Sequence, residues 1–259
     1  MEEVRHLSCT VAGGVAEIRV SRPERRNAFT DTMYKELASW LFDLDADPAV
    51  RCIVIRGTNG IFTSGSDVTC FRDRTPLERE RHFQLVADLV TAPSRIGKPV
   101  IAAVQGIALG GGTGLTASCD LAIAEEGAVF GLPEIKVGFW PCTISPVVAR
   151  AIGPRKAFEM ALLGERYDAE QAASIGLVNR VVPAGSFDAE VKAVADRIAS
   201  FSAVAVQMGK RYFQQSLDLE FEKAVRFMGC AMALSSTTED AQEGISAFLE
   251  KRQPQWKDQ

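Results

Sequence analysis

The chain has 259 residues, enough to bury a substantial core, and its 47% hydrophobic and 24% charged residues are ordinary for a globular protein. The net charge of −4 argues against nucleic acid as a partner, and the apolar runs are shorter than the roughly 18 residues of a membrane span. The six cysteines are scattered without a C-x-x-C pair, which predicts a reducing, cytoplasmic environment and argues against a zinc site. The start, Met1-Glu2-Glu3, lacks the basic and apolar regions of a signal peptide.

The first elements along the chain are short strands separated by helices. Alternating runs at residues 4–11 and 15–20 are joined by Gly13-Gly14, which predicts a hairpin. An amphipathic helix is expected to start near Thr30. Further elements are expected as buried strands at 52–55, 99–104 and 121–124, a charged helix at 77–89, and a short helix that follows the glycines at 106–112 and ends near 120. This alternation predicts an α/β fold.

Helices dominate after Pro141. One strand is expected at 177–182, and Asp168 with Gln171 resembles a capping box. The predicted helices cover residues 145–152, 154–163, 168–174, 187–201, 205–216, 221–234 and 241–252. We therefore expect a strand-rich core over residues 1–195 and a helical region over 196–259.

Three segments are candidates for a functional site. Residues 62–68 follow a buried strand and contain small residues that let a ligand approach the backbone closely; a plain polar turn is the alternative. Residues 106–114 lead into a helix N-terminus, which stabilises anions. A dinucleotide pattern at 112–117 is rejected because the following helix is too short. Residues 130–138 place Glu134 beside a proline among apolar residues, as a partly desolvated base. The alternative for Glu134 is a salt bridge to Lys136 or Arg150.

Taken in order, six segments resemble the crotonase superfamily, also called the enoyl-CoA hydratase/isomerase family. They are residues 14–18 with 22–29, residues 62–67, 99–120, 130–138, 164–183 and 244–252. The resemblance implies a spiral of strand-strand-helix turns followed by a helical trimerisation region, in a homotrimer or a dimer of trimers. It also implies an acyl-CoA or enoyl-CoA thioester as substrate.

The resemblance also implies roles for individual residues. Glu134 would move protons, while the backbone N–H groups of Ser66 and Gly111 would stabilise an enolate oxygen. Arg25 or Arg26 would meet the CoA phosphates, and Phe248 and Lys251 would reach the CoA of a neighbouring subunit. The remaining residues expected along the substrate are Ser64, Ser66, Asp67, Val68, Gly110, Pro133 and Trp140, the last in the acyl pocket. No metal or redox cofactor is implied, because the coenzyme A is part of the substrate.

One position departs from the family pattern. Typical hydratases carry a second glutamate where this chain has Gly114. A single carboxylate favours isomerisation of a 3-enoyl-CoA to a 2-enoyl-CoA over hydration, although Thr113 or the backbone could hold a water instead. Thioester hydrolysis, decarboxylation and non-catalytic binding of CoA thioesters also stay open. A serine hydrolase using Ser64 or Ser66 is disfavoured, because the two histidines, His6 and His82, are expected at the surface.

Overall fold

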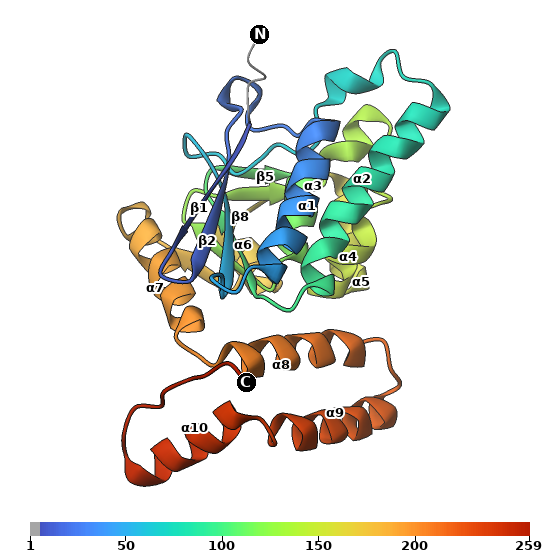
Figure 1. The fold of residues 1–259 in the computed structure, drawn as a ribbon. Coiled ribbons are helices and arrows are strands. Elements are labelled where there is room, and N and C mark those ends of the chain that lie inside the picture. Colours follow the sequence, from blue (N-terminus) through green and yellow to red (C-terminus); the bar gives the residue numbers. More distant parts are fainter. Residues whose placement is uncertain (1–5) are drawn as a thin grey trace.

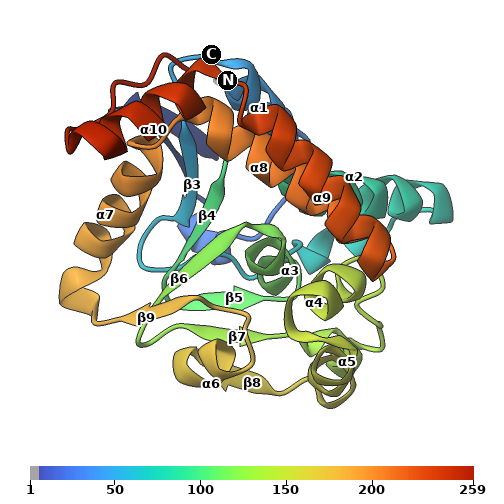
Figure 2. The same ribbon diagram turned by 90° about the horizontal axis from the view of Figure 1, so that it is seen from below.

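The computed structural model describes residues 6–259, so the signal-peptide expectation and the predicted start of the first strand at residue 4 lie outside the described residues. Its main sheet has six strands in the order β1-β2-β3-β4-β6-β9 (Figures 1 and 2). These strands are β1 (Leu7–Ala12), β2 (Val15–Val20), β3 (Cys52–Gly57), β4 (Val100–Val104), β6 (Leu121–Glu125) and β9 (Arg180–Val182). β1 and β2 form the predicted antiparallel hairpin, and every other pairing in this sheet is parallel.

A second, smaller sheet lies beside the first and was not predicted from the sequence. It pairs β5 (Ile107–Leu109), β7 (Val129–Gly131) and β8 (Arg166–Asp168). Each strand has three residues, too few for an alternating pattern to be recognised. β5 leads directly into the helix α3 (Gly111–Ser118) and packs against it, and Figure 2 shows the two elements side by side.

Helices cover the sheets and close the core. They are α1 (Asp31–Ala46), α2 (Pro76–Arg95), α3 (Gly111–Ser118), α4 (Ser145–Ile152), α5 (Pro154–Leu163), α6 (Ala169–Ser174) and α7 (Phe187–Ala199). Short 3-10 turns occupy η1 (Pro23–Arg25), η2 (Val68–Phe71), η3 (Pro133–Val137) and η4 (Ala184–Ser186). The large buried side chains of α1, including Leu37 and Leu41, join one continuous core with the strands.

Side-chain caps fix where several of these helices begin. Thr30 accepts a hydrogen bond from the Met33 N–H at the start of α1. Asp168 and Gln171 form a capping box at α6, as predicted. A capping box between Thr75 and Glu78 starts α2 at Pro76, one residue before the expected start, and the helix runs on to Arg95, past the expected end at residue 89.

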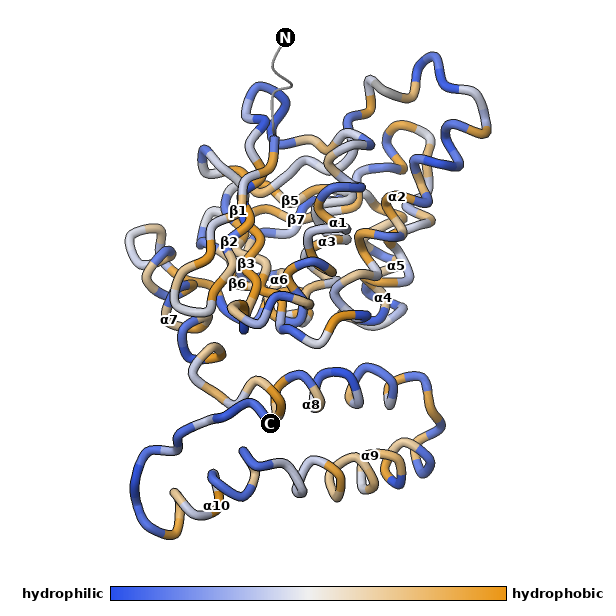
Figure 3. Tube along the Cα trace, in the orientation of Figure 1, coloured by the Kyte–Doolittle hydropathy of each residue, from blue (hydrophilic) through white to orange (hydrophobic). Residues whose placement is uncertain are grey.

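The C-terminal helices α8 (Ala203–Ser216), α9 (Phe221–Ser235) and α10 (Glu239–Glu250) gather on one side of the core (Figure 1). Apolar segments are visible along them in Figure 3. Several large apolar side chains there are exposed: Phe213, Leu217, Phe221, Val225, Met232, Leu234, Ile245, Phe248 and Leu249. The boundary at residues 195 and 196 stays a prediction. No helix within residues 6–259 is long and apolar enough to cross a membrane.

Candidate active site

Glu134 lies in the η3 turn directly after Pro133, where its side chain is half-buried. Its Oε2 atom is buried and has no hydrogen-bond partner among the described residues. Burial raises the pKa of this carboxyl above its usual value, an effect that a hydrogen bond from its own backbone N–H partly offsets. The salt-bridge alternative is wrong, because Arg150 pairs with Asp218 at 2.7 Å and Lys136 makes no ion pair in the described structure. An unpaired, desolvated carboxylate is suited to moving protons.

The two expected oxyanion donors lie where two loops meet, with the Ser66 nitrogen 3.8 Å from the position of a Cβ on Gly111. Within residues 6–259, neither the Ser66 N–H nor the Gly111 N–H has a hydrogen-bond acceptor. Gly65 brings the loops together: its φ is +88°, and a Cβ there would lie 2.9 Å from the Gly111 nitrogen and 2.7 Å from the Leu109 oxygen. Only glycine fits this left-handed, crowded position. The loops therefore present two free N–H groups side by side.

Glu134 and the oxyanion donors belong to one site. A Cβ on Gly110, whose φ is +53°, would lie 2.7 Å from Oε1 of Glu134. Gly110 precedes Gly111, the first residue of α3, so the carboxylate lies over this helix N-terminus. A bound thioester with its oxygen on the two N–H groups would therefore place its carbon atoms beside Glu134.

The position expected to carry a second carboxylate has no room for a side chain. A Cβ on Gly114 would lie 2.6 Å from Cγ2 and 2.8 Å from Cβ of Ile144, which fills this space from the start of α4. Thr113 offers no replacement: its buried hydroxyl has the carbonyl oxygens of Ala108 and Gly131 in reach as acceptors, at 2.7 and 2.9 Å, and accepts from the Gly131 N–H at 3.1 Å. The expectation that the Thr113 side chain holds a water is therefore wrong.

His82 is not the surface residue that the sequence led us to expect. It is only 1% exposed and lies on the inner face of α2. Its Nε2 atom is 3.1 Å from Oγ of Ser66, and its Nδ1 atom is 2.7 Å from Oδ1 of Asp31. Tyr34 adds a fourth group, with its hydroxyl 2.8 Å from Oγ of Ser66. The helical spacing of His82 with the buried Val86 is the signal that could have placed this histidine inside.

Arg25 and Arg26 lie next to the first loop. The Ser64 N–H donates to the Arg26 carbonyl at 3.1 Å, and both arginine side chains are exposed without an ion pair in the described structure. Val68 is also exposed. Asp67 is engaged within the protein, because its carboxylate pairs with Arg22 at 2.7 Å. Asp67 therefore holds the loop rather than presenting a free charge.

Three other expected residues lie farther along the chain. Trp140 is half-buried and packs on Phe158, with ring centroids 5.3 Å apart. Phe248, 83% exposed, lies in α10, and Lys251 caps the end of that helix. α10 lies on the far side of α8 from the core in Figure 1, so these two residues do not join Glu134 within one protomer.

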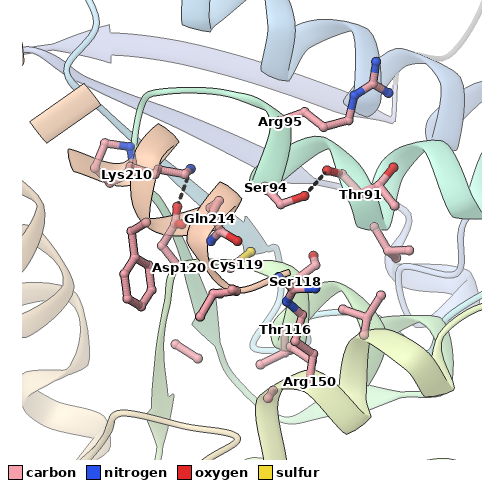
Figure 4. Close-up of a pocket in the computed structure, with 18 of the residues that line it drawn as sticks. Thr91, Ser94, Arg95, Thr116, Ser118, Cys119, Asp120, Arg150, Lys210 and Gln214 are labelled. Carbon is pink, nitrogen blue, oxygen red and sulfur yellow. Dashed lines mark hydrogen bonds and ion pairs between the residues drawn. The ribbon is translucent and has the colours of Figure 1, made fainter. Parts of the chain in front are cut away.

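A cavity of about 1160 Å³ is separate from this site. It lies between α2, α3, α4 and α8, and none of Glu134, Ser66 and Gly111 lines it. Figure 4 shows the Lys210–Asp120 ion pair, 2.6 Å long, at its wall. Within residues 6–259, no group of three or more His, Cys, Asp or Glu side chains is arranged to hold a metal ion.

The α/β core and the helical C-terminal region are those of a crotonase-fold protein. Its candidate site combines a helix N-terminus, two free backbone N–H groups and one desolvated carboxylate. The enoyl-CoA hydratase/isomerase family model matches residues 10–259, and the chain belongs to this family. It is 33% identical over 258 residues to enoyl-CoA hydratase domain-containing protein 3 of Rattus norvegicus, covering 98% of this chain and 85% of that protein.

Solved structures agree with this assignment. The human enoyl-CoA hydratase domain-containing protein 3 superposes with a TM-score of 0.94 at 32% identity, covering 97% of this chain and 100% of that one. An enoyl-CoA hydratase from Mycobacterium smegmatis also gives a TM-score of 0.94, at 35% identity, covering 98% and 99% of the two chains. The predicted α/β crotonase-like fold with a helical C-terminal region is thereby confirmed, and trimerisation through that region stays a prediction.

Proposed function

We propose that this protein is an enoyl-CoA isomerase that shifts the double bond of a 3-enoyl-CoA to position 2, with Glu134 as its acid and base. The observation that carries the proposal is the contact between Gly114 and Ile144, which leaves no space for a second carboxylate. Syn addition of water in this family uses two glutamates, whereas a proton shuttle between C2 and C4 needs one.

Each step of the shift has a group in place. The thioester oxygen accepts hydrogen bonds from the N–H groups of Ser66 and Gly111, which stabilise the negative charge that forms when Glu134 removes a proton from C2. The protonated Glu134 then returns this proton at C4. Removal of one oxyanion donor typically costs about 2.7–4 kcal/mol of transition-state stabilisation, so the backbone pair carries much of the catalysis. The raised pKa of Glu134 suits a group that must both accept and release a proton.

The remaining substrate contacts follow the same arrangement. The exposed guanidinium groups of Arg25 and Arg26 meet the CoA phosphates, while Ser64 and Val68 border the path of the pantetheine chain. Phe248 and Lys251 contact the CoA bound to a neighbouring subunit, and Trp140 lines part of the acyl pocket. The reaction takes no metal or redox cofactor. The scattered cysteine spacing, without a C-x-x-C pair, favours a reducing, cytoplasmic location.

A paired assay tests the isomerase proposal. Purified protein is given a 3-enoyl-CoA and, separately, a trans-2-enoyl-CoA, and the absorbance of the conjugated thioester is followed. We expect a rise with the first substrate, and Glu134→Gln should slow it about 10²–10⁴-fold. Glu80→Gln, which changes an exposed glutamate of α2, is the matched control and should leave the rate unchanged.

Two other results would point elsewhere. Several similar proteins are named enoyl-CoA hydratases, so hydration is the second candidate. A fall in the absorbance of the conjugated thioester with the 2-enoyl-CoA, and no rise with the 3-enoyl-CoA, would support hydration without a second glutamate. Binding of acyl-CoA with no turnover of either substrate would instead indicate a non-catalytic CoA-binding protein.

A further inference from the structure

Three side chains from separate parts of the chain form a continuous hydrogen-bonded series next to the oxyanion donors. Asp31 opens α1, His82 lies in the second turn of α2, and Ser66 lies in the first loop. The distances are 2.7 Å from Asp31 Oδ1 to His82 Nδ1 and 3.1 Å from His82 Nε2 to Ser66 Oγ. A nucleophile in reach of a base, which is itself oriented by a third group, is the arrangement that activates a serine hydroxyl.

The charges around Asp31 set the direction of the hydrogen bonds. Burial alone would raise the pKa of Asp31, but hydrogen bonds from His82 and Arg74 hold this pKa below its usual value. The carboxylate is therefore ionised and accepts hydrogen bonds. Nδ1 of His82 therefore donates to Asp31, and in the neutral ring Nε2 is then the acceptor that faces the Ser66 hydroxyl. The Tyr34 hydroxyl donates to Oγ of Ser66 in turn. In this tautomer Nε2 of His82 lies within hydrogen-bond reach of the Ser66 proton.

Aromatic rings hold the imidazole in this orientation. The ring of His82 makes edge contacts with Tyr34, Phe71 and Phe83, at centroid distances of 5.5, 4.8 and 5.2 Å. Because the ring is 1% exposed, it cannot turn away into solvent. Ser66 as a whole is half-buried, whereas His82 and Tyr34 are buried, so Ser66 is the member of the series nearest to solvent.

Ser66 supplies both the hydroxyl and one oxyanion N–H. In serine proteases the nucleophilic serine likewise contributes its own N–H to the oxyanion hole. A thioester oxygen bound to the N–H groups of Ser66 and Gly111 would therefore bring its carbonyl carbon close to Oγ of Ser66. The site thus joins a base, an oriented hydroxyl and oxyanion donors.

We propose that Ser66 is an acyl-accepting nucleophile, which gives the protein a second activity as an acyl-CoA thioesterase. The Ser66 oxygen attacks the thioester carbon while His82 takes its proton. The C–S bond then breaks, and the CoA sulfur leaves with the proton from His82. Water, deprotonated by His82, attacks the acyl-Ser66 ester, and the carboxylic acid and the free Ser66 hydroxyl are released. Asp31 is a positioning residue that orients His82.

The thioesterase proposal rests on the acyl-CoA substrate class of the proposed function but not on isomerisation. A saturated acyl-CoA such as butyryl-CoA has no double bond to shift, so it tests the second activity alone. CoA release is followed with a thiol-reactive dye, and intact-protein mass spectrometry detects the acyl-enzyme. A fluorophosphonate probe measures the reactivity of the Ser66 hydroxyl without any substrate.

We expect wild-type protein to release CoA and to be labelled by the probe at Ser66. Ser66→Ala and His82→Gln should each lower CoA release at least about a thousandfold. Asp31→Asn should slow it as well, and Asp31→Glu should restore part of the rate, which loss of folding alone would not produce. Ser39→Ala, an exposed serine of α1, is the matched control.

The outcomes separate the two proposals. CoA release without isomerisation would support the thioesterase and contradict the isomerase. Isomerisation without CoA release or labelling of Ser66 would overturn the thioesterase and leave the hydrogen-bonded series as a support for the loop. CoA release that persists in a folded Ser66→Ala variant would also overturn it.

Discussion

At the scale of single residues, burial of Glu134 makes its charged form costly in the folded protein. Burial raises the pKa of this carboxyl, so the folded state holds its proton at pH values where the unfolded chain has released it. Stability falls with rising pH wherever the folded state binds more protons than the unfolded state. Glu134 therefore lowers the free energy of unfolding at neutral pH and above, and supplies a group that can transfer protons.

Glu134→Gln should raise the melting temperature at pH 8, because it removes this cost. The gain should shrink as the pH falls through the raised folded pKa, and vanish below the ordinary value of 4.5, where the glutamate is protonated in both states. Thermal unfolding at pH 5 and pH 8 measures the difference. A variant less stable than wild type at pH 8 would contradict the assigned cause.

The residues of the site differed in how well the sequence predicted them. Glu134, Ser66 and Gly111 follow strands in segments whose small or apolar neighbours are a local signal. Asp31 and His82 meet across 51 residues, so no local pattern pairs them. The charged neighbours of His82 also hid its position on the buried face of α2, although the spacing to Val86 contained that information.

At the scale of elements, one largely buried ion pair, whose Lys210 and Asp120 side chains are 8% and 18% exposed, fixes α8 to the sheet core. Lys210 donates to Asp120 at 2.6 Å and to the Lys98 carbonyl at 2.7 Å, while Asp120 accepts from the Val100 N–H at 2.7 Å. Desolvation raises the pKa of Asp120, and Lys210 partly offsets this effect. The pair therefore links α8 to the start of β4.

Lys210→Met should lower the free energy of unfolding by roughly 3 kcal/mol, because it leaves Asp120 buried without its partner. Urea denaturation measures the change. Lys192→Met, which breaks an exposed pair with Asp196 in α7, is the matched control and should cost about 0.5 kcal/mol or less. Equal effects of the two variants would show that the buried pair does not anchor α8.

Element length decided how well the secondary structure was predicted. The long helices α1, α7, α8 and α9 repeat their apolar spacing over several turns, and their bounds lie close to the expected ones. The strands of the small sheet exist through pairing with distant segments, which their own three residues cannot reveal. β9 is also shorter than expected, because Leu177 and Val178 are buried in the core without joining the strand.

At the scale of the whole molecule, the exposed apolar side chains of α8, α9 and α10 are too numerous for an isolated surface. Phe221, Met232 and Phe248 are 80%, 71% and 83% exposed. Patches of this kind mark surfaces that other proteins cover. They support the proposal that a second copy of the chain covers this face, and the family resemblance implies a homotrimer or a dimer of trimers.

Light scattering on a sizing column should therefore give three or six times the 28.1 kDa mass of one chain. Met232→Glu should shift the protein towards smaller species, because burying an unpaired charge in an interface is costly. Val11→Glu, at an exposed position of β1, should leave the mass unchanged. A wild-type mass equal to one chain would contradict assembly.

The contact of Ile144 with Gly114 constrains how this protein can change during evolution. A glutamate at position 114 would meet the β-branched carbon of Ile144, which cannot swing aside as the tip of a long side chain can. A smaller residue at 144 must come first, at the cost of a cavity in the core. The two positions are therefore epistatic, because the effect of a glutamate at 114 depends on the residue at 144. Evolution towards hydration would pass through an intermediate that has a smaller residue at 144 and still has Gly114. That intermediate is less stable and has no hydratase activity to select for.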